Sequence, residues 1–387
     1  MKKIMRFFSL ISVMLILLNC SVAAQTNPTA SLDIKAKSAI LVEASTGKIL
    51  FELNSHERLP PASVTKTMTL LLIMEALDSG RISLNDTVTC SEYAASMGGS
   101  QVYLAPGEQM SVHDMLKAIA VASANDASVA MAEHIYGSEE AFVKAMNDKA
   151  AELGMKDTQF MNCTGLDAEG HYSSAYDIAL MSRELLKHPK VHDYLTIWID
   201  SLRNGQFGLA NTNKLIRFYE GANGIKTGST SKALYCLAAS AKRDGMQLIA
   251  VIMASPTTKD RFDGATKLLN YGFANYAIVN GTKEGEAIGE LEVLKGMKNK
   301  VNLVASKDYN LLVKKGQKGN IERKVDVSED VIAPVEKGQK VGEITFFVDG
   351  EELGKVDIVT AEAVEKVSVG RVFIKLLRQW LNAKDST

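Results

Sequence analysis

Three short polar strings constrain this 387-residue chain more than any other feature. They are Ser63-Val-Thr-Lys66, Ser123-Ala-Asn125 and Lys226-Thr-Gly228, in this order along the chain. A serine hydroxyl is a poor nucleophile at its ordinary pKa and needs a nearby base. Each string alone is typical of a helix cap or a turn, but together they supply two serines, two lysines and an amide. Their joint occurrence predicts a serine acyl-transfer site in which lysine replaces histidine.

The first string opens a segment that is apolar on nearly every side. A Pro-Pro pair precedes it and Asp-Ser-Gly follows it, so the sequence predicts a helix from Ser63 to Leu77. A helix that is apolar all round is buried in the core of a domain. Lys66 lies three residues after Ser63, so the two side chains share one face. Burial disfavours charged lysine and lowers its pKa, which makes Lys66 a candidate acceptor for the serine proton.

Strand patterns at both ends of residues 31–280 enclose a helical middle. The arrangement predicts one antiparallel sheet flanked by a helical cluster, an α+β domain with Ser63 on the helical side and Lys226 on a strand. The elements that support it are a hairpin of Ser38–Glu43 and Ile49–Leu53, a capped helix from Ser111 to Val121, strands Leu234–Ala241 and Gln247–Ala254, and a closing helix from Asp260 to Ala277.

Residues 281–363 have a different texture, rich in Val, Lys, Glu and Gly, with short alternating stretches. This pattern predicts a small all-β sandwich domain that holds the catalytic domain away from a membrane. Nothing in this region indicates catalysis.

The sequences of both ends of the chain predict a location outside the cytoplasm. Residues 1–24 have a basic start, an apolar core and a small-residue end, the pattern of a secretory signal peptide. A lipoprotein modified at Cys20 is a weaker alternative, because asparagine precedes this cysteine. Residues 364–387 predict a basic amphipathic helix that anchors the protein to a membrane surface, although such a helix could also pack on the protein. We therefore expect an exported protein on the outer face of the cytoplasmic membrane.

Composition argues against several other functions. The formal net charge of −1 gives no indication of a nucleic-acid partner. Neither a metal-ligand spacing nor a phosphate-binding loop is present, so no metal or cofactor is predicted. Three cysteines follow the signal segment, an odd number that implies no disulfide framework and favours buried, inert thiols. His171 falls near the expected site and is interpreted as structural.

The chain resembles a known protein family over a region much wider than the three strings. The chain resembles the low-molecular-weight penicillin-binding proteins, which are serine-type D-alanyl-D-alanine carboxypeptidases with a β-lactamase-like fold. The similarity covers nearly the whole expected mature length. Besides the three strings, it is carried by the stretches Ala39–Lys48, Pro61–Lys66, Thr164–Leu166, Ser173–Asp177 and Lys267–Phe273.

The resemblance implies a role for each residue that matches the family's motifs. Ser63 resembles the acylated nucleophile, and Lys66 resembles its base. Ser123 corresponds to the hydroxyl that passes a proton to the leaving amine. Asn125 corresponds to the amide that holds the substrate's peptide bond. Lys226 corresponds to a second cation that polarises Ser123 and attracts the substrate carboxylate.

Four further residues are implied to bind substrate. Thr227, Gly228 and Thr230 match the strand edge along which an extended peptide lies, and Gly228 permits close backbone approach. Arg261 matches the arginine that binds the terminal carboxylate, because a guanidinium pairs with it in bidentate fashion. A surface charge on the last helix is the alternative for Arg261. The oxyanion hole is implied to be backbone N–H groups of Ser63 and of the Lys226 strand.

The implied reaction removes the terminal D-alanine of peptidoglycan stem pentapeptides through an acyl-Ser63 intermediate. β-Lactams would acylate the same serine. Gln159 stands where class A β-lactamases need a glutamate to activate water, so a long-lived penicilloyl adduct is expected. A transpeptidase or endopeptidase with the same residues is an alternative, and so is a penicillin-sensing wall-binding protein without turnover.

Overall fold

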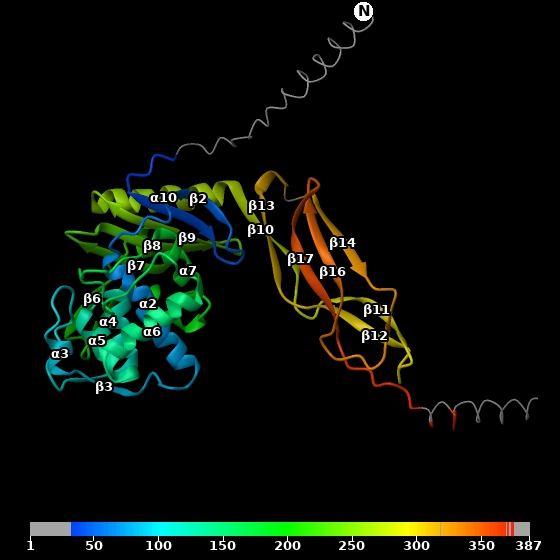
Figure 1. Ribbon diagram of the computed structural model, residues 1–387. Coiled ribbons are helices and arrows are strands. Elements are labelled where there is room, and N and C mark those ends of the chain that lie inside the picture. The colour runs from blue at the N-terminus through cyan, green and yellow to red at the C-terminus, as the bar shows by residue number, and fades with distance from the viewer. Residues whose placement is uncertain (1–31, 318, 369, 371–372, 375–387) are drawn as a thin grey trace, which may run out of the picture. The chain divides into compact units, whose positions relative to one another are not determined.

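Figure 1 shows the computed structural model of the chain, which describes residues 32–317, 319–368, 370, 373 and 374. The predicted signal peptide lies outside these residues, as does most of the predicted anchoring helix. The described chain comprises a mixed α+β domain, which ends with helix α10 (Thr258–Asn275), and an all-β domain after it. None of the described helices has the length and apolar character needed to cross a membrane.

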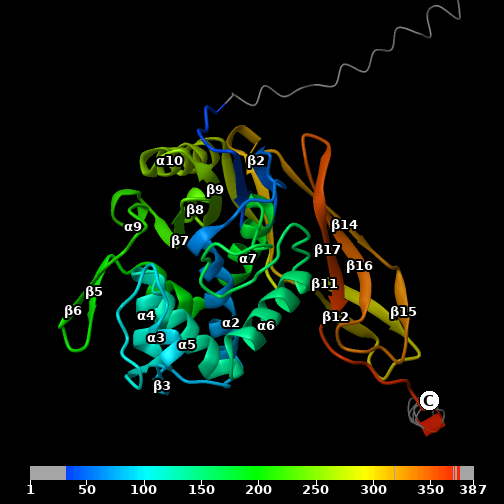
Figure 2. The same cartoon turned by 60° about the vertical axis from the view of Figure 1, so that its left-hand side comes forward.

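A five-stranded antiparallel sheet forms the frame of the first domain. Its two central long strands consist mostly of buried Ala, Val, Ile and Leu, since both of their faces are covered. Helix α10 covers one face of the sheet, and helices α2 and α7 lie on the other (Figures 1 and 2). The strands in their order across the sheet are β2 (Ile49–Leu53), β1 (Ser38–Glu43), β9 (Met246–Ser255), β8 (Leu234–Arg243) and β7 (Ala222–Thr230).

The sheet brings the two ends of the domain's sequence together. β1 pairs with β9 in a register that places Ile40 opposite Val251, so the opening hairpin joins strands about two hundred residues later. β7 lies at one edge, where, among the residues that the structure describes, it has a neighbouring strand only on the β8 side. An edge strand keeps backbone groups that can pair with an extended ligand.

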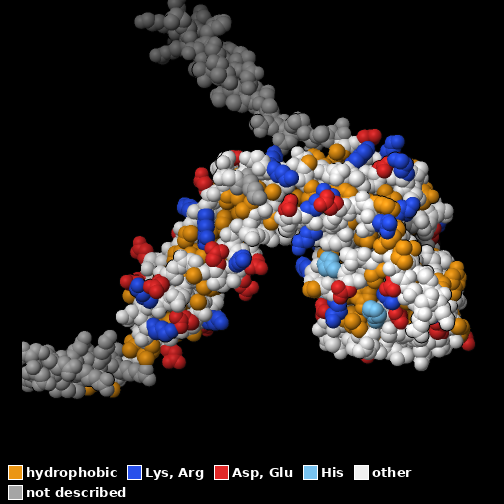
Figure 3. Space-filling model, turned by 180° about the vertical axis from the view of Figure 1, so that it is seen from behind, with side chains coloured by type: hydrophobic (Ala, Val, Ile, Leu, Met, Phe, Trp, Pro, Cys, Tyr) orange, Lys and Arg blue, Asp and Glu red, His pale blue; other side chains and the backbone are white. Residues whose placement is uncertain are grey.

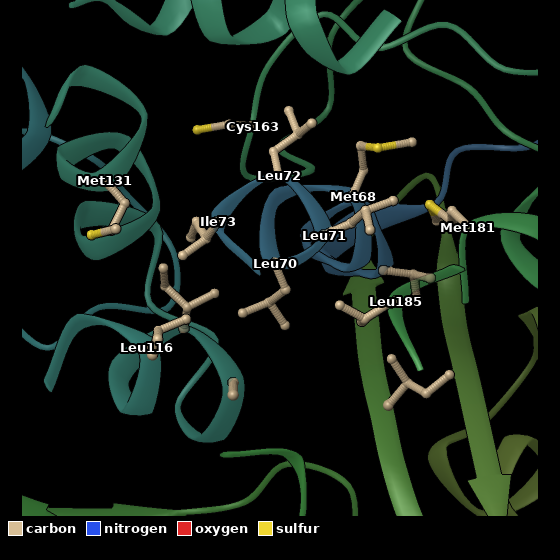
Figure 4. Packing of buried hydrophobic residues seen from close by; sticks show 14 of the residues in the cluster. Met68, Leu70, Leu71, Leu72, Ile73, Leu116, Met131, Cys163, Met181 and Leu185 are labelled. Atoms are coloured by element: carbon tan, nitrogen blue, oxygen red, sulfur yellow. The ribbon is translucent and has the colours of Figure 1, made fainter. Parts of the chain in front are cut away.

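Helix α2 (Lys66–Asp78) runs through the centre of the helical cluster, and ten of its thirteen residues are buried. Side chains from three other helices and from Cys163 surround it (Figure 4). The helices of this domain are α2, α3 (Glu92–Ala95), α4 (Val112–Val121), α5 (Asn125–Tyr136), α6 (Glu139–Glu152), α7 (Ala175–Leu185), α8 (His192–Leu195), α9 (Leu215–Phe218) and α10, with 3-10 turns η1 (Ala62–Thr65) and η2 (Pro189–Val191). Figure 4 labels Met68, Leu70, Leu71, Leu72 and Ile73 of α2 with Leu116 of α4, Met131 of α5, and Met181 and Leu185 of α7.

Two small antiparallel sheets of two strands each complete the domain. They are β3 (Thr87–Thr89) with β4 (Gln109–Ser111), and β5 (Ile199–Leu202) with β6 (Phe207–Ala210). β4 leads directly into α4, whose N-cap Ser111 accepts a hydrogen bond from the backbone N–H of Asp114. This cap is the one that the sequence predicts.

The α+β architecture is confirmed, with two local differences. The first turn of the predicted central helix is the 3-10 turn η1, so Ser63 precedes the α-helix and Lys66 begins it. The predicted closing helix ends at Asn275, and Ala277 lies in strand β10. Periodicity alone does not place helix ends to within two residues.

The second domain contains a six-stranded sheet and a two-stranded sheet. The pairs in the larger sheet are antiparallel except for β11 with β15. Its strands in order are β14 (Ile321–Val327), β16 (Lys340–Val348), β17 (Glu351–Thr360), β12 (Lys300–Ala305), β11 (Ala287–Leu294) and β15 (Asp330–Ile332). The smaller sheet pairs β10 (Tyr276–Thr282) with β13 (Tyr309–Lys314), and the 3-10 turn η3 (Lys315–Gln317) follows it.

One apolar core joins the two sheets of this domain, with Ile344, Phe346 and Ile358 of the larger sheet and Leu311 of the smaller in the same cluster. Val364 is buried in this core, and its backbone pairs with that of Val335 in an antiparallel β-bridge. The backbone of Lys366 pairs with that of Gly296 in the same way. The backbone is therefore extended at both residues, and the predicted anchoring helix cannot begin at Val364.

The three thiols of the described chain are buried, as the sequence predicts. Acidic and basic side chains intermingle on the face seen in Figure 3. Cys90, Cys163 and Cys236 are free and buried. Burial raises the pKa of the Cys90 and Cys236 thiols to about 11, so these thiols are un-ionised at neutral pH.

Candidate active site

Ser63 lies in the 3-10 turn η1, pressed between two glycines from distant segments. A Cβ atom on Gly165 would lie 1.9 Å from the carbonyl oxygen of Ala62, and one on Gly228 would lie 2.9 Å from the backbone nitrogen of Ser63. Ala62, directly before the serine, has a φ of 48°, which is unusual for a residue with a side chain. Strained backbone of this kind persists only where the surroundings hold it, and here the two close contacts do so.

Lys66 is completely buried, and its amine is the centre of a hydrogen-bond cluster. Nζ donates to Asn125 Oδ1 at 2.5 Å and to the Thr164 carbonyl at 2.6 Å, and it lies 3.2 Å from Ser63 Oγ. Burial lowers the pKa of Lys66 from 10.5 to about 7, while Asp126 acts in the opposite direction. A large fraction of this amine is therefore neutral near physiological pH.

The partners of Lys66 suit a neutral amine. Such an amine has two N–H groups and one lone pair, and the Asn125 and Thr164 oxygens can accept both N–H groups. The remaining direction faces Ser63 Oγ, so the lone pair can accept the serine proton. The cluster can therefore generate a nucleophilic alkoxide without a histidine.

Ser123 and Asn125 occupy the junction between α4 and α5. Ser123 has a φ of 64°, and its buried Oγ has no hydrogen-bond partner among the described residues. Asn125 begins α5, and its Nδ2 donates to the Gly98 carbonyl at 2.6 Å. The next residue, Asp126, is buried and accepts backbone N–H groups of Val102 and Leu104, which holds the 98–104 segment beside the site.

Lys226, Thr227, Gly228 and Thr230 lie on the edge strand β7. Lys226 is fully buried, and its pKa is well below the usual lysine value because of burial and the nearby positive charges of Lys66 and Arg261. Thr227 Oγ1 donates to Thr212 Oγ1 at 2.6 Å, which ties β7 to the segment after β6.

Arg261 lies on α10, and its side chain extends to the neighbouring strands β7 and β8. Its Nη1 donates to the carbonyls of Gly228 at 3.0 Å and Cys236 at 3.3 Å. Its guanidinium lies 5.0 Å from the ring centroid of Phe262 and 5.5 Å from that of Tyr235. Arg261 is 7% exposed, so it is not a surface charge. The arginine is positioned to present a fixed positive charge beneath the strand.

His171 has a structural role, as expected, because its ring connects two segments by hydrogen bonds. Its Nδ1 accepts the backbone N–H of Met161 at 2.9 Å, and its Nε2 lies 2.8 Å from Thr65 Oγ1. Burial lowers the pKa of His171 to about 4, so the ring is neutral and Nε2 carries the proton. The ring joins the 161–171 segment to the turn that holds Ser63.

Hydrogen bonds and backbone contacts connect most of the sequence-predicted site residues. Ser63, Lys66 and Asn125 share one cluster, and Gly228 and Arg261 meet at the strand behind Ser63. Sequence reasoning missed the carbonyls of Thr164 and Gly98, the role of Gly165 as a spacer, and the bond between Thr230 and Asp167. No motif encodes a backbone carbonyl, although Thr164 and Gly165 lie in a stretch that already marks the family resemblance.

Comparisons with known proteins cover nearly the whole described chain. The family model for D-alanyl-D-alanine carboxypeptidase matches residues 22–257, and that for the C-terminal domain of penicillin-binding protein 5 matches residues 277–366. The chain is 47% identical over 360 residues to D-alanyl-D-alanine carboxypeptidase DacF of Bacillus subtilis, which covers 92% of each chain. It is 35% identical to DacC of Escherichia coli over 93% of this chain and 92% of that relative.

Solved structures agree with the sequence relatives. The crystal structure of penicillin-binding protein 5 from Haemophilus influenzae superposes with a TM-score of 0.78 and 33% identity, over 87% of this chain and 99% of that chain. Penicillin-binding protein D2 from Listeria monocytogenes, in its ampicillin-bound form, matches with a TM-score of 0.58 and 31% identity over 62% of this chain and 99% of that chain.

The lowered pKa of Lys66 predicts a pH-dependent contribution to stability. Between pH 7 and 10.5 the folded chain holds fewer protons on Lys66 than the unfolded chain, so unfolding takes up a proton. The free energy of unfolding of the wild type relative to Lys66→Met should therefore rise over this range, by at most about 1.4 kcal/mol per pH unit. Urea unfolding of both proteins at pH 6.5, 8 and 9.5 measures the difference.

The exposed Lys232→Met variant is the control for loss of a lysine charge. If the difference between wild type and Lys66→Met does not change with pH, Lys66 has an ordinary pKa and cannot be the base.

Proposed function

The chain belongs to the D-alanyl-D-alanine carboxypeptidase family, and from this membership we propose how its site removes the terminal D-alanine of a peptidoglycan stem peptide. The observation that carries the proposal is the contact of Lys66 Nζ with Ser63 Oγ inside a buried cluster whose other two partners are acceptors. Lys66 takes the Ser63 proton, and Oγ attacks the carbonyl carbon of the penultimate D-alanine. The N–H of Ser63 and an N–H of β7 stabilise the oxyanion.

Collapse of this intermediate breaks the peptide bond. The proton that Lys66 took from Ser63 is relayed through the Ser123 hydroxyl to the nitrogen of the departing D-alanine. Lys66 is then neutral again, and the remaining peptide stays as an ester on Ser63. Water then attacks the ester carbonyl, the acyl oxygen bond breaks, and Ser63 regains its proton. Asn125 holds the substrate amide, Arg261 attracts the terminal carboxylate by charge, and the buried Lys226 amine donates a hydrogen bond to that carboxylate. Thr227, Gly228 and Thr230 line the strand edge with which the peptide pairs.

β-Lactams acylate the same serine in this proposal. Their strained amide opens when Ser63 Oγ attacks, but the leaving nitrogen stays attached to the adduct. Gln159 cannot act as a general base toward water, because its side-chain amide has no proton-accepting carboxylate. The penicilloyl ester on Ser63 is therefore long-lived.

The first test uses the chain without residues 1–24 beside its Ser63→Ala variant, with a pentapeptide ending in D-Ala-D-Ala as substrate. Mass spectrometry should show loss of one alanine over many turnovers in the wild type, and none above background in the variant. Cross-linked peptide products would identify a transpeptidase. A stable penicillin adduct without peptide turnover would identify a sensor.

Two glycines in one loop provide a matched test of how the nucleophile is positioned. Gly165 and Gly170 have similar φ angles, 84° and 79°, so alanine is strained at both. Only at Gly165 would the new Cβ overlap backbone, that of Ala62 next to Ser63. Gly165→Ala should slow acylation of Ser63 by a fluorescent penicillin about a hundredfold. Gly170→Ala should acylate near the wild-type rate, and equal rates for the two variants would show that the Gly165 contact does not position Ser63.

We also propose that the protein is exported and anchored to the outer face of the cytoplasmic membrane. The composition of residues 1–24 and the basic, apolar pattern after residue 368 support this location. Since Val364 and Lys366 belong to the β domain, the anchor is assigned to residues 369–387.

Deletion of residues 369–387 should release active protein from membranes into the soluble fraction, while deletion of residues 385–387 alone should not. Fluorescent-penicillin labelling of both fractions measures the distribution. Equal membrane retention of the long deletion would refute the anchor.

A further inference from the structure

Thr164 supplies one of the acceptors of the buried Lys66 amine, and side chains from two helices hold the backbone directly before it. The backbone N–H of Cys163 donates to Glu139 Oε1 at 3.0 Å, and the Cys163 carbonyl accepts a hydrogen bond from Thr69 Oγ1 at 2.7 Å. Glu139 is the first residue of α6, and Thr69 lies on α2. These two bonds connect the loop to the helical cluster one residue away from the Thr164 carbonyl.

Glu139 is held at both of its carboxylate oxygens. Oε1 accepts the Cys163 N–H, and Oε2 accepts the hydroxyl of Tyr93, from helix α3, at 2.6 Å. The bond to Glu139 raises the pKa of Tyr93 to about 12, so the phenol keeps its proton and remains a donor. The carboxylate also lies in the first turn of α6, where the helix dipole favours negative charge. Glu139 is therefore a fixed link from α3 and α6 to the backbone of Cys163.

The orientation of the Lys66 amine depends on where the Thr164 carbonyl lies. Nζ donates to this carbonyl at 2.6 Å and to Asn125 Oδ1 at 2.5 Å, and Ser63 Oγ lies 3.2 Å away in the remaining direction. A neutral amine has two N–H groups, so two fixed acceptors determine where its lone pair points. A misplacement of about 1 Å in a reacting geometry can lower a rate about a hundredfold. A residue that fixes the carbonyl can thus act on the reaction from a distance.

We propose that Glu139 is a positioning residue for acylation, which holds the Cys163 N–H and thereby fixes the Thr164 carbonyl that orients the Lys66 amine toward Ser63. The inference rests on the proposed acylation of Ser63 and adds a residue from outside the three motifs. Because Glu139 acts through a backbone hydrogen bond, the role requires an acceptor atom at Oε1 but no negative charge.

Three variants of the full chain separate the acceptor from the charge. Glu139→Ala removes both and should slow acylation of Ser63 by a fluorescent penicillin about tenfold. Glu139→Gln keeps an oxygen that can accept the Cys163 N–H, so it should retain most of the wild-type rate. Glu140→Ala removes the exposed acid next to it in the same helical turn and should be acylated at the wild-type rate.

The pH profile of acylation distinguishes positioning from a loss of folded protein. Its acid limb follows the ionisation of Lys66, whose pKa is about 7. A carbonyl stabilises the charged amine more than the neutral one, so Glu139→Ala should move this limb to lower pH by about half a pH unit. Glu139→Gln should leave the limb in place. The ionisable groups near the amine, which are Asp126, Lys226 and the buried Cys163 thiol, are the same in all variants.

The outcomes separate the inference from the proposed function. If penicillin does not acylate the wild type, the proposed function is wrong and the inference falls with it. If the wild type is acylated and Glu139→Ala matches it in rate and pH profile, or only labels a smaller fraction of protein at an unchanged rate, the inference alone is overturned. Equal slowing of Glu139→Gln and Glu139→Ala would assign the effect to the charge and would also overturn it.

Discussion

The burial of the Lys66 amine is the constraint on which the rest of the site depends. A charged ammonium in this position would lose its hydration, and the Asn125 and Thr164 oxygens replace only part of it as hydrogen-bond acceptors. The balance favours the neutral form near pH 7 and points the lone pair at Ser63. The apolar helix α2 therefore contributes to catalysis as well as to the core, because its burial lowers the pKa of Lys66 at its start.

Close backbone packing complements this electrostatic arrangement. Two segments that are far apart in sequence pack directly against the turn that holds Ser63, one at Gly165 and the other at Gly228. The same two segments carry the Thr164 carbonyl and the edge of β7. Positioning of the nucleophile, activation of the nucleophile and presentation of the strand are therefore coupled, and a change that moves one segment affects all three.

How much of the site was predictable differs from residue to residue. The pairing of Ser63 with Lys66 was accessible, because three residues of helical spacing put both on one face. The structural role of His171 was also expected, and its two hydrogen bonds agree. The extended backbone at Val364 was not expected, and only the pairing of Val364 with Val335 and of Lys366 with Gly296 shows that the β domain continues past residue 363. The bond from Thr230 to Asp167 had no local signal, because it joins residues 63 positions apart.

The sequence by itself determined the class of fold and the chemical groups of the site. Apolar periodicity, caps and the spacing of Ser63 and Lys66 are local properties that a few neighbouring residues encode. Only the tertiary structure decided which backbone atoms complete the site, such as the Thr164 carbonyl, 98 residues from Lys66 in sequence. Every residue carries the same backbone donor and acceptor, so their identity holds no information about their use. That use depends on which distant segments pack together, and packing is a property of the whole fold.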